Sequence, residues 1–218
     1  MNWHLRKILP FILQTLIWIP TRAVLRIFGR FEVRGLENLN NLKGGVVFAS
    51  NHGSELDPIL LPAALPIFSR FMPIFYVSRE KEFYNRQAFL KWVFYREWFF
   101  KIWGAYRARV GKHDYEKSLR DHIDMVRNGC SVFIFPEGEK TPDGKLLRAH
   151  GGVTYLSQKT GALIVPVSIS GIFKMTPLDF FTRKRKITLV FCKPQTPSTA
   201  DYKSEAEELM KIIESNLV

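Results

Sequence analysis

The segment VVFASNHGSELDP (residues 46–58) is where an apolar run gives way to polar chemistry. Its first five residues are apolar or small, which favours a strand buried on both faces, as in a parallel sheet. His52 and Asp57 follow within seven positions of the strand's end. In open α/β sheets, ligands bind beyond the carboxyl ends of the strands. The segment therefore predicts both the fold class and the place of a functional site.

Similar apolar runs recur and alternate with helical patterns. RFEVRGLENL predicts a short strand and a turn, and Gly129 is expected to cap a helix that begins at Asp114. This alternation predicts an α/β fold with a mostly parallel central sheet flanked by helices. Further buried strands are expected at residues 74–77, 131–135, 163–169 and 187–191, and helices at residues 114–129, 151–161 and 202–217.

The charge balance points to an anionic partner. The 218 residues include 32 Lys and Arg against 20 Asp and Glu, a net charge of +12. Such an excess is typical of proteins that meet nucleic acid, phosphate-bearing substrates or an acidic membrane, and charge alone does not choose among them. Cys130 and Cys192 lie in apolar runs, which favours a core role in a reducing compartment.

The amino terminus is apolar and basic. ILPFILQTLIWIP (residues 8–20) is shorter than the roughly 20 apolar residues of a spanning helix. Arginines on both sides favour an amphipathic helix that lies on a membrane, whereas a core helix is the alternative. A signal peptide is disfavoured because no small-residue cleavage site follows. We expect residues 1–30 to form this membrane-associating segment and residues 31–218 to form the α/β domain.

Aromatic and basic residues alternate in FYNRQAFLKWVFYREWFFKIWG (residues 83–104) at helix-compatible spacing. Trp and Tyr beside Lys and Arg are typical of a helix at a membrane interface, which could also line an acyl chain. Two alternatives are an ordinary helix that covers the sheet and a surface on which nucleic-acid bases stack.

Three polar segments could carry chemistry. A carboxylate at Asp57 could fix the tautomer of His52 and stabilise the charge that forms when its imidazole accepts a proton, although His52 could equally cap a turn. FPEGEKTPDG (residues 135–144) and GAYRARVGKHD (residues 104–114) offer groups that suit a phosphate, although both could be ordinary surface loops. The phosphate-binding candidates are Lys140, Thr141, Arg107 and Arg109.

In this order, NHGSELD, GAYRARV, FPEGEKT and LIVPVSI resemble four motifs of the glycerolipid acyltransferases, and FEVRGLENL resembles their usual lead-in. The resemblance covers roughly residues 30 to 200 and is greatest to the bacterial lysophosphatidic acid acyltransferases. It implies that His52 is a general base oriented by Asp57. A glycerol hydroxyl would then attack the thioester of acyl-CoA or acyl carrier protein directly, which agrees with the lack of a G-x-S-x-G nucleophile elbow.

The resemblance also implies the remaining site residues. Glu137 and Gly138 match the family's substrate-binding turn, and Arg109 or Arg107 matches its phosphate-gripping arginine. Asn51 and Ser54 of the first motif are expected to assist substrate binding. Neither a metal nor a cofactor is implied beyond the acyl donor.

The implied partners are a lysophospholipid acceptor, such as 1-acylglycerol-3-phosphate on its way to phosphatidic acid, and acyl-CoA or acyl carrier protein, with no nucleic acid. The implied location is the cytoplasmic face of the inner membrane. The sequence departs from the family where Glu139, Lys140 and Thr141 replace T-R-S. Because lysine lacks the arginine fork, another lysophospholipid or a lyso-aminolipid is an alternative acceptor. A non-catalytic basic binding module and a thioesterase or lipid hydrolase are further alternatives.

Overall fold

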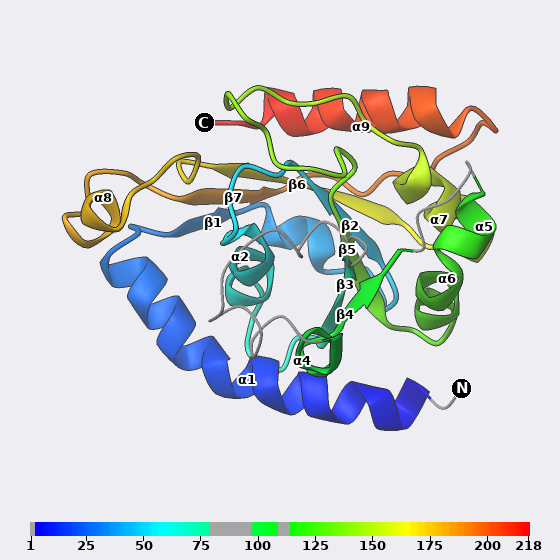
Figure 1. The fold of residues 1–218 in the computed structure, drawn as a ribbon, viewed down its shortest axis with the longest axis horizontal. Helices are drawn as coiled ribbons and strands as arrows, with labels where there is room; N and C mark the ends of the chain where they lie inside the picture. The colour runs from blue at the N-terminus through cyan, green and yellow to red at the C-terminus, as the bar shows by residue number, and fades with distance from the viewer. Residues whose placement is uncertain (1–2, 79–96, 109–113) are drawn as a thin grey trace.

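The computed structural model describes residues 3–78, 97–108 and 114–218, and its centre is a seven-stranded sheet (Figure 1). The strand order is β1-β7-β6-β2-β5-β3-β4. The strands are β1 Glu32–Arg34, β2 Val47–Ser50, β3 Ile74–Ser78, β4 Ala105–Arg107, β5 Ser131–Ile134, β6 Ile164–Ser170 and β7 Thr188–Phe191.

The sheet is mostly parallel, as predicted. Strands β6, β2, β5, β3 and β4 pair in parallel, β7 runs antiparallel to β6, and β1 is parallel to β7. Each predicted buried run forms a strand. The edge strand β4 was not predicted, because three residues are too few to show a strand pattern.

The predicted helices form in the predicted order, but one of them is divided into two. The predicted helix at 114–129 is two helices, because the backbone leaves helical geometry at Leu119 (φ −107°, ψ 14°). Gly129 ends the second with φ +73°, as expected of a capping glycine. The helices are α1 Trp3–Ile27, η1 Leu36–Leu39, α2 Asp57–Ala64, α4 Glu97–Ile102, α5 Tyr115–Ser118, α6 Arg120–Arg127, α7 Gly152–Thr160, α8 Pro177–Phe181 and α9 Tyr202–Ser215.

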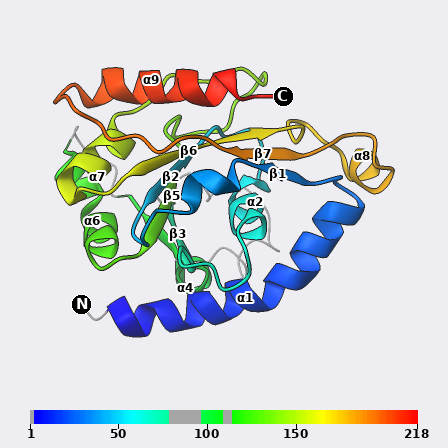
Figure 2. The same cartoon turned by 180° about the vertical axis from the view of Figure 1, so that it is seen from behind.

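Helices cover both faces of the sheet (Figures 1 and 2). One buried cluster joins Phe48 of β2 to Leu60 of α2 and Leu25 of α1. The other joins Val47 of β2 to residues of α6, α7 and α9. Because successive side chains of a strand point to opposite faces, a strand covered on both sides must be apolar throughout, which explains the continuous runs.

Helix α1 runs along the domain beside α2 and α4 (Figure 1). Length and composition would allow Arg6–Ile27 to cross a membrane. However, Gln14 in its apolar stretch is buried and bonds to the sheet: its amide nitrogen donates to the carbonyls of Ile74 (2.8 Å) and Trp103 (3.0 Å), and its oxygen accepts from the amide of Ile74 (2.9 Å). One face of α1 is therefore fastened to the domain.

A second set of contacts fastens α1 to the carboxyl end of α2. The guanidinium of Arg22 donates to the carbonyls of Ala63, Ala64 and Leu65, at 2.6 to 3.2 Å. The indole of Trp18 donates to the carbonyl of Leu65 at 3.0 Å. These donors satisfy carbonyl groups that a helix leaves unpaired at its last turn.

The predicted aromatic helix at 83–104 overlaps α4 at its end, while residues 83–96 lie outside the described part of the chain. Cys130 and Cys192 are buried free thiols, as predicted. Burial raises the pKa of both thiols, to about 11 for Cys192.

Candidate active site

The site begins at the carboxyl end of β2, the central strand. There the side chain of Asn51 bridges to β6: its nitrogen donates to the carbonyl of Ile169 and its oxygen accepts from the amide of Ile169, both at 2.9 Å. Asn51 is 8% exposed. Both of its polar atoms are engaged by the protein's own backbone, so this residue fixes where β2 ends.

His52 and Asp57 meet directly after that point. Nδ1 of His52 lies 2.9 Å from Oδ2 of Asp57. The same oxygen accepts the backbone amides of Gly53 and Ser54, both at 2.7 Å. The five-residue interval places the two side chains together because the chain turns at Ser54 and enters α2 at Asp57.

Hydrogen bonds hold the buried side chain of Asp57 at the start of α2. Three donors converge on its Oδ2, whereas its Oδ1 has no hydrogen-bond partner among the described residues, and the helix dipole stabilises negative charge at this position. Since a carboxylate only accepts, Nδ1 of His52 carries the proton in this pair. The lone pair of Nε2 is left to accept a proton, which is the arrangement a general base requires.

The imidazole of His52 is also held by a ring. Phe135, the residue after β5, stacks on it with ring centroids 3.9 Å apart and an interplanar angle of 12°. The His52 side chain is 16% exposed. Sequence reasoning assigned Phe135 no role beyond the end of a strand, although its place beside Glu137 in FPEG was the available signal.

Glu137 braces the backbone at the site. Its Oε1 accepts the amide of His52 at 2.7 Å, and its Oε2 accepts the amide of Leu147 at 2.6 Å. The residue is 2% exposed. Burial raises the pKa of Glu137, and the two amide donors oppose that rise. Both carboxylate oxygens are thus taken up by backbone rather than open toward a ligand.

The turn after Glu137 folds over the same strand end. Gly138 has φ +70°, and a Cβ there would lie 3.2 Å from the His150 ring. The amide of Thr141 donates to the carbonyl of His52 at 2.9 Å. His52 is therefore bonded through its amide, its carbonyl and its ring, which leaves its backbone little freedom.

Among the predicted phosphate groups, Lys140 and Thr141 lie at this turn. Nζ of Lys140 pairs with Oε1 of Glu55 at 2.5 Å, which joins the two candidate loops. The hydroxyl of Thr141 contacts Asp143 and the amide of Gly144. Sequence reasoning did not assign Glu55 a role.

Of the other predicted residues, Ser54 lies in the turn beside the reactive pair and Arg107 lies further out. The hydroxyl of Ser54 accepts the amide of Leu56 at 3.2 Å within the turn. Arg107 ends β4 on the same edge of the sheet, but β4 is three strands from β2, about 14 Å at ordinary strand spacing. Arg109 lies outside the described residues.

Fold and site together define an α/β protein with a carboxylate-oriented histidine at the carboxyl edge of its sheet. A family model described as Acyltransferase matches residues 30–170, well over half of the chain. The chain belongs to this acyltransferase family.

Curated relatives carry more specific names. The chain is 27% identical over 195 residues to a chloroplastic 1-acyl-sn-glycerol-3-phosphate acyltransferase of Brassica napus. That alignment covers 88% of this chain and 52% of the relative. The chain is 29% identical over 157 residues to the human 1-acyl-sn-glycerol-3-phosphate acyltransferase beta. That alignment covers 70% of this chain and 51% of the human protein. The chain thus spans about half the length of these relatives.

A solved structure shares the fold. The crystal structure of the 1-acyl-sn-glycerophosphate acyltransferase of Thermotoga maritima matches with a TM-score of 0.62 and 19% identity, over 93% of this chain and 79% of that one. This likeness extends the shared fold to nearly the whole of the described protein.

Proposed function

We propose that this protein moves a fatty acyl group from an acyl thioester to the hydroxyl of a lysophospholipid, with 1-acylglycerol-3-phosphate as the acceptor and phosphatidic acid as the product. The observation that carries the proposal is the bond between His52 Nδ1 and the fully buried carboxylate of Asp57. The names of the Brassica and human relatives support the choice of acceptor.

In the proposed reaction, Nε2 of His52 takes the proton of the acceptor hydroxyl while the hydroxyl oxygen attacks the thioester carbonyl. Asp57 stabilises the imidazolium that results. The tetrahedral intermediate then collapses, the carbon–sulfur bond breaks, and the imidazolium returns the proton to the leaving thiolate. The transfer is direct, with no acyl-enzyme.

We assign Glu137 and Asn51 to positioning. Each is buried, and each bonds to the backbone at or beside the end of β2 through both of its polar atoms. Rigid placement of a base within a few tenths of an ångström contributes strongly to rate. This role differs from the substrate binding implied by the family resemblance and is supported by the engaged side-chain atoms.

The acceptor phosphate is proposed to bind at the turn that carries Lys140. The ammonium of Lys140 would leave Glu55 and pair with the phosphate instead. This exchange is feasible because exposed ion pairs contribute little free energy. Arg107 and Arg109 stay predicted contributors from the β4 side. A lyso-aminolipid acceptor is the second candidate, favoured by Glu55 and Glu139, two carboxylates that such an amine could meet.

We propose that α1 lies on the cytoplasmic face of the inner membrane, with residues 1–30 as the associating segment and residues 31–218 as the acyltransferase domain. The face of α1 away from the domain carries apolar side chains that are largely exposed, among them Ile8, Ile12, Leu16, Ile19 and Ile27. The net charge of +12 would favour both an anionic bilayer and an anionic donor, acyl-CoA or acyl carrier protein.

The test is an acceptor panel. The purified full chain is incubated with labelled acyl-CoA or acyl carrier protein and several lysolipids, and lipid products are separated. We expect acylated 1-acylglycerol-3-phosphate, and a fall in turnover of about a hundredfold to ten-thousandfold for His52→Ala.

Three outcomes would reject the proposal. Release of free fatty acid without any acceptor dependence would indicate a thioesterase or hydrolase. Lack of any product would leave a binding module as the better account. Full turnover by His52→Ala would show that His52 is not the general base. The matched control is His150→Ala, an exposed histidine near the same turn.

A further inference from the structure

A short helix at the edge of the sheet presents apolar side chains to solvent. Helix α8 lies in the connection between β6 and β7, where Leu178 is 65% exposed and Phe181 is 60% exposed. Four basic residues follow, Arg183, Lys184, Arg185 and Lys186. We call these six residues the α8 tip. The side chains of Leu178 and Phe181 are thus left largely open to solvent, although the ring of Phe181 also contacts that of Phe28.

The α8 tip is preformed. A capping box closes the start of the helix: the hydroxyl of Thr176 accepts the amide of Asp179 at 3.1 Å, and the Asp179 carboxylate accepts the amide of Thr176 at 3.1 Å. Leu178 and Phe181 are therefore held in a helix without help from a partner.

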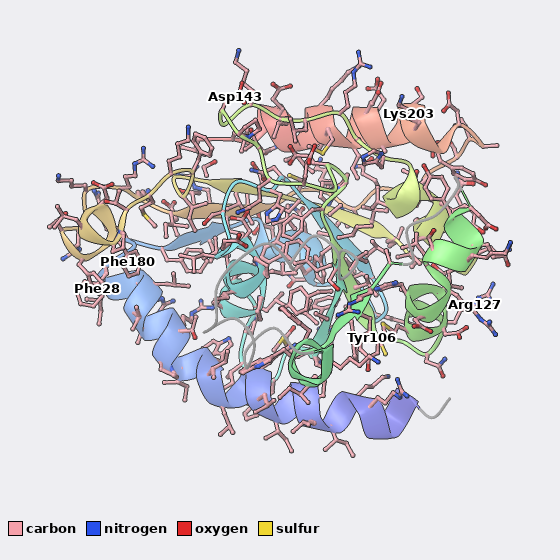
Figure 3. The ribbon with its side chains drawn as sticks, viewed as in Figure 1. Phe28, Tyr106, Arg127, Asp143, Phe180 and Lys203 are labelled. Carbon is pink, nitrogen blue, oxygen red and sulfur yellow. The ribbon has the colours of Figure 1, made fainter. Side chains whose placement is uncertain are left out.

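Aromatic contacts also join the tip to the end of α1. Phe28 lies 6.0 Å from Phe180 and 5.2 Å from Phe181, measured between ring centroids. Figure 3 shows Phe28 and Phe180 side by side where α1 meets α8. The tip thus extends the exposed apolar side of α1 at its carboxyl end.

The charges around the tip are mostly positive. Residues 171–187 contain five basic side chains and one acidic side chain, Asp179, a net charge of +4. Lys186 pairs with Glu32, and Nζ of Lys184 lies 3.9 Å from Asp179. All four residues of the basic run are exposed. Apolar side chains bordered by lysine and arginine are the pattern of a segment that enters the interface of an anionic bilayer.

We propose that the α8 tip is a second lipid contact, in which Leu178 and Phe181 enter an anionic phospholipid bilayer and the basic run binds its head groups. The inference rests on the proposed membrane association of α1 but not on the proposed chemistry. An anionic bilayer is favoured over a protein partner because the positive charge is continuous with the tip and α1 exposes a neighbouring apolar face. Two attachment points fix the orientation of the domain, which a single helix leaves free to roll.

The test places an environment-sensitive thiol-reactive dye at the tip of the full chain through Leu178→Cys. Cys130 and Cys192 are buried, which directs the label to the new thiol. Vesicles contain equimolar phosphatidylcholine and phosphatidylglycerol. The control label is at Lys203→Cys on α9, which lies on the opposite side of the molecule from α1 (Figure 3). We expect emission at position 178, and not at 203, to shift to the blue and to be quenched by spin-labelled lipid.

Binding measurements complete the test. Leu178→Ser/Phe181→Ser should lower the vesicle partition coefficient roughly tenfold or more. Arg183→Glu/Lys184→Glu should weaken binding to the mixed vesicles, whereas Lys203→Glu/Lys211→Glu on α9 should change it far less. Water-like emission at 178 in vesicle-bound protein, or no vesicle binding at all, would overturn the proposal. A blue shift that needs no vesicles and grows with protein concentration would indicate a second copy instead and would also overturn it.

Acyl transfer is measured separately on a short-chain, water-soluble lysophospholipid. The tip variants should retain wild-type turnover there, because none of the contacts described for His52 involves Leu178, Phe181, Arg183 or Lys184. If wild type lacks transfer while the label still enters lipid, the proposed function falls and the lipid contact stands.

Discussion

The backbone amide of His52 donates a 2.7 Å hydrogen bond to Oε1 of Glu137, a residue 85 positions later in the chain. The other oxygen of Glu137 accepts the amide of Leu147. One buried side chain thus connects the end of β2 with the loop that follows β5, and it does so at the residue that carries the proposed base.

Replacing this carboxylate tests the positioning role. In Glu137→Gln, the amide group can accept only one of the two backbone donors, so one amide is left buried without a partner. We expect the free energy of unfolding to fall by about 1–3 kcal/mol. Turnover should fall about tenfold or more with little change in KM for the donor. Urea denaturation and steady-state kinetics measure the two effects.

The control is Glu139→Gln, an exposed neighbour, whose stability should stay within about 0.5 kcal/mol of wild type. A Glu137→Gln variant that raised KM for the acceptor at unchanged kcat would favour substrate contact over positioning.

Asp57→Asn tests the orienting carboxylate. The asparagine oxygen can still accept the amides of Gly53 and Ser54, so the fold should persist. The neutral side chain cannot stabilise an imidazolium at His52, and kcat should fall about a hundredfold or more. Circular dichroism and kinetics are compared with Asp143→Asn, at a surface turn. Wild-type kcat in Asp57→Asn would remove Asp57 from the mechanism.

Gln14→Leu tests how α1 is attached. The substitution removes three hydrogen bonds, two of them to the buried amide and carbonyl of Ile74. We expect a loss of about 2–4 kcal/mol in the free energy of unfolding, measured in urea. Leu16→Gln, on the exposed side of the same helix, should lose far less stability and should instead weaken vesicle binding. Equal stability losses in the two variants would contradict the two-faced arrangement of α1.

A buried histidine predicts acid sensitivity. Burial in α6 lowers the pKa of His122 to about 4. An unfolded chain binds that proton near pH 6.5, so it holds more protons than the folded chain between these values, and stability falls as the pH drops from about 6.5 toward 4. The full difference corresponds to about 3 kcal/mol.

Urea denaturation at several pH values checks this expectation. The slope of stability against pH should flatten in His122→Leu, which cannot bind the proton when unfolded. It should persist in His150→Gln, an exposed position. An unchanged slope in His122→Leu would assign the acid sensitivity to other groups.

Much of the fold could be predicted because strands covered on both faces must be apolar throughout. Runs such as residues 46–50 and 131–135 therefore marked β2 and β5 within a residue or two. Shorter features had no such signal. β4 is three residues at an edge, and the break between α5 and α6 at Leu119 depends on packing rather than on a helix-breaking residue.

The site likewise had a part that could be predicted and a part that could not. The pairing of His52 with Asp57 follows from local spacing and could be predicted. The contacts of Glu137 and Asn51 join strands that neighbour β2, so they depend on sheet order, and a sequence motif does not reveal whether a polar side chain serves the backbone or a ligand. The stacking of Phe135 on His52 has the same origin.

The attachment of Arg22 to the end of α2 has a geometric consequence. Asp57 begins that helix, and eight residues span about 12 Å. Helix α2 thus holds the proposed membrane helix at a constant distance from His52 and Asp57. If α1 rests in the bilayer as proposed, its depth sets how far an acceptor must rise from the lipid to meet His52. The thickness of the head-group layer would then decide whether the acceptor hydroxyl reaches His52. Lipid composition would change turnover without a change in any residue of the site.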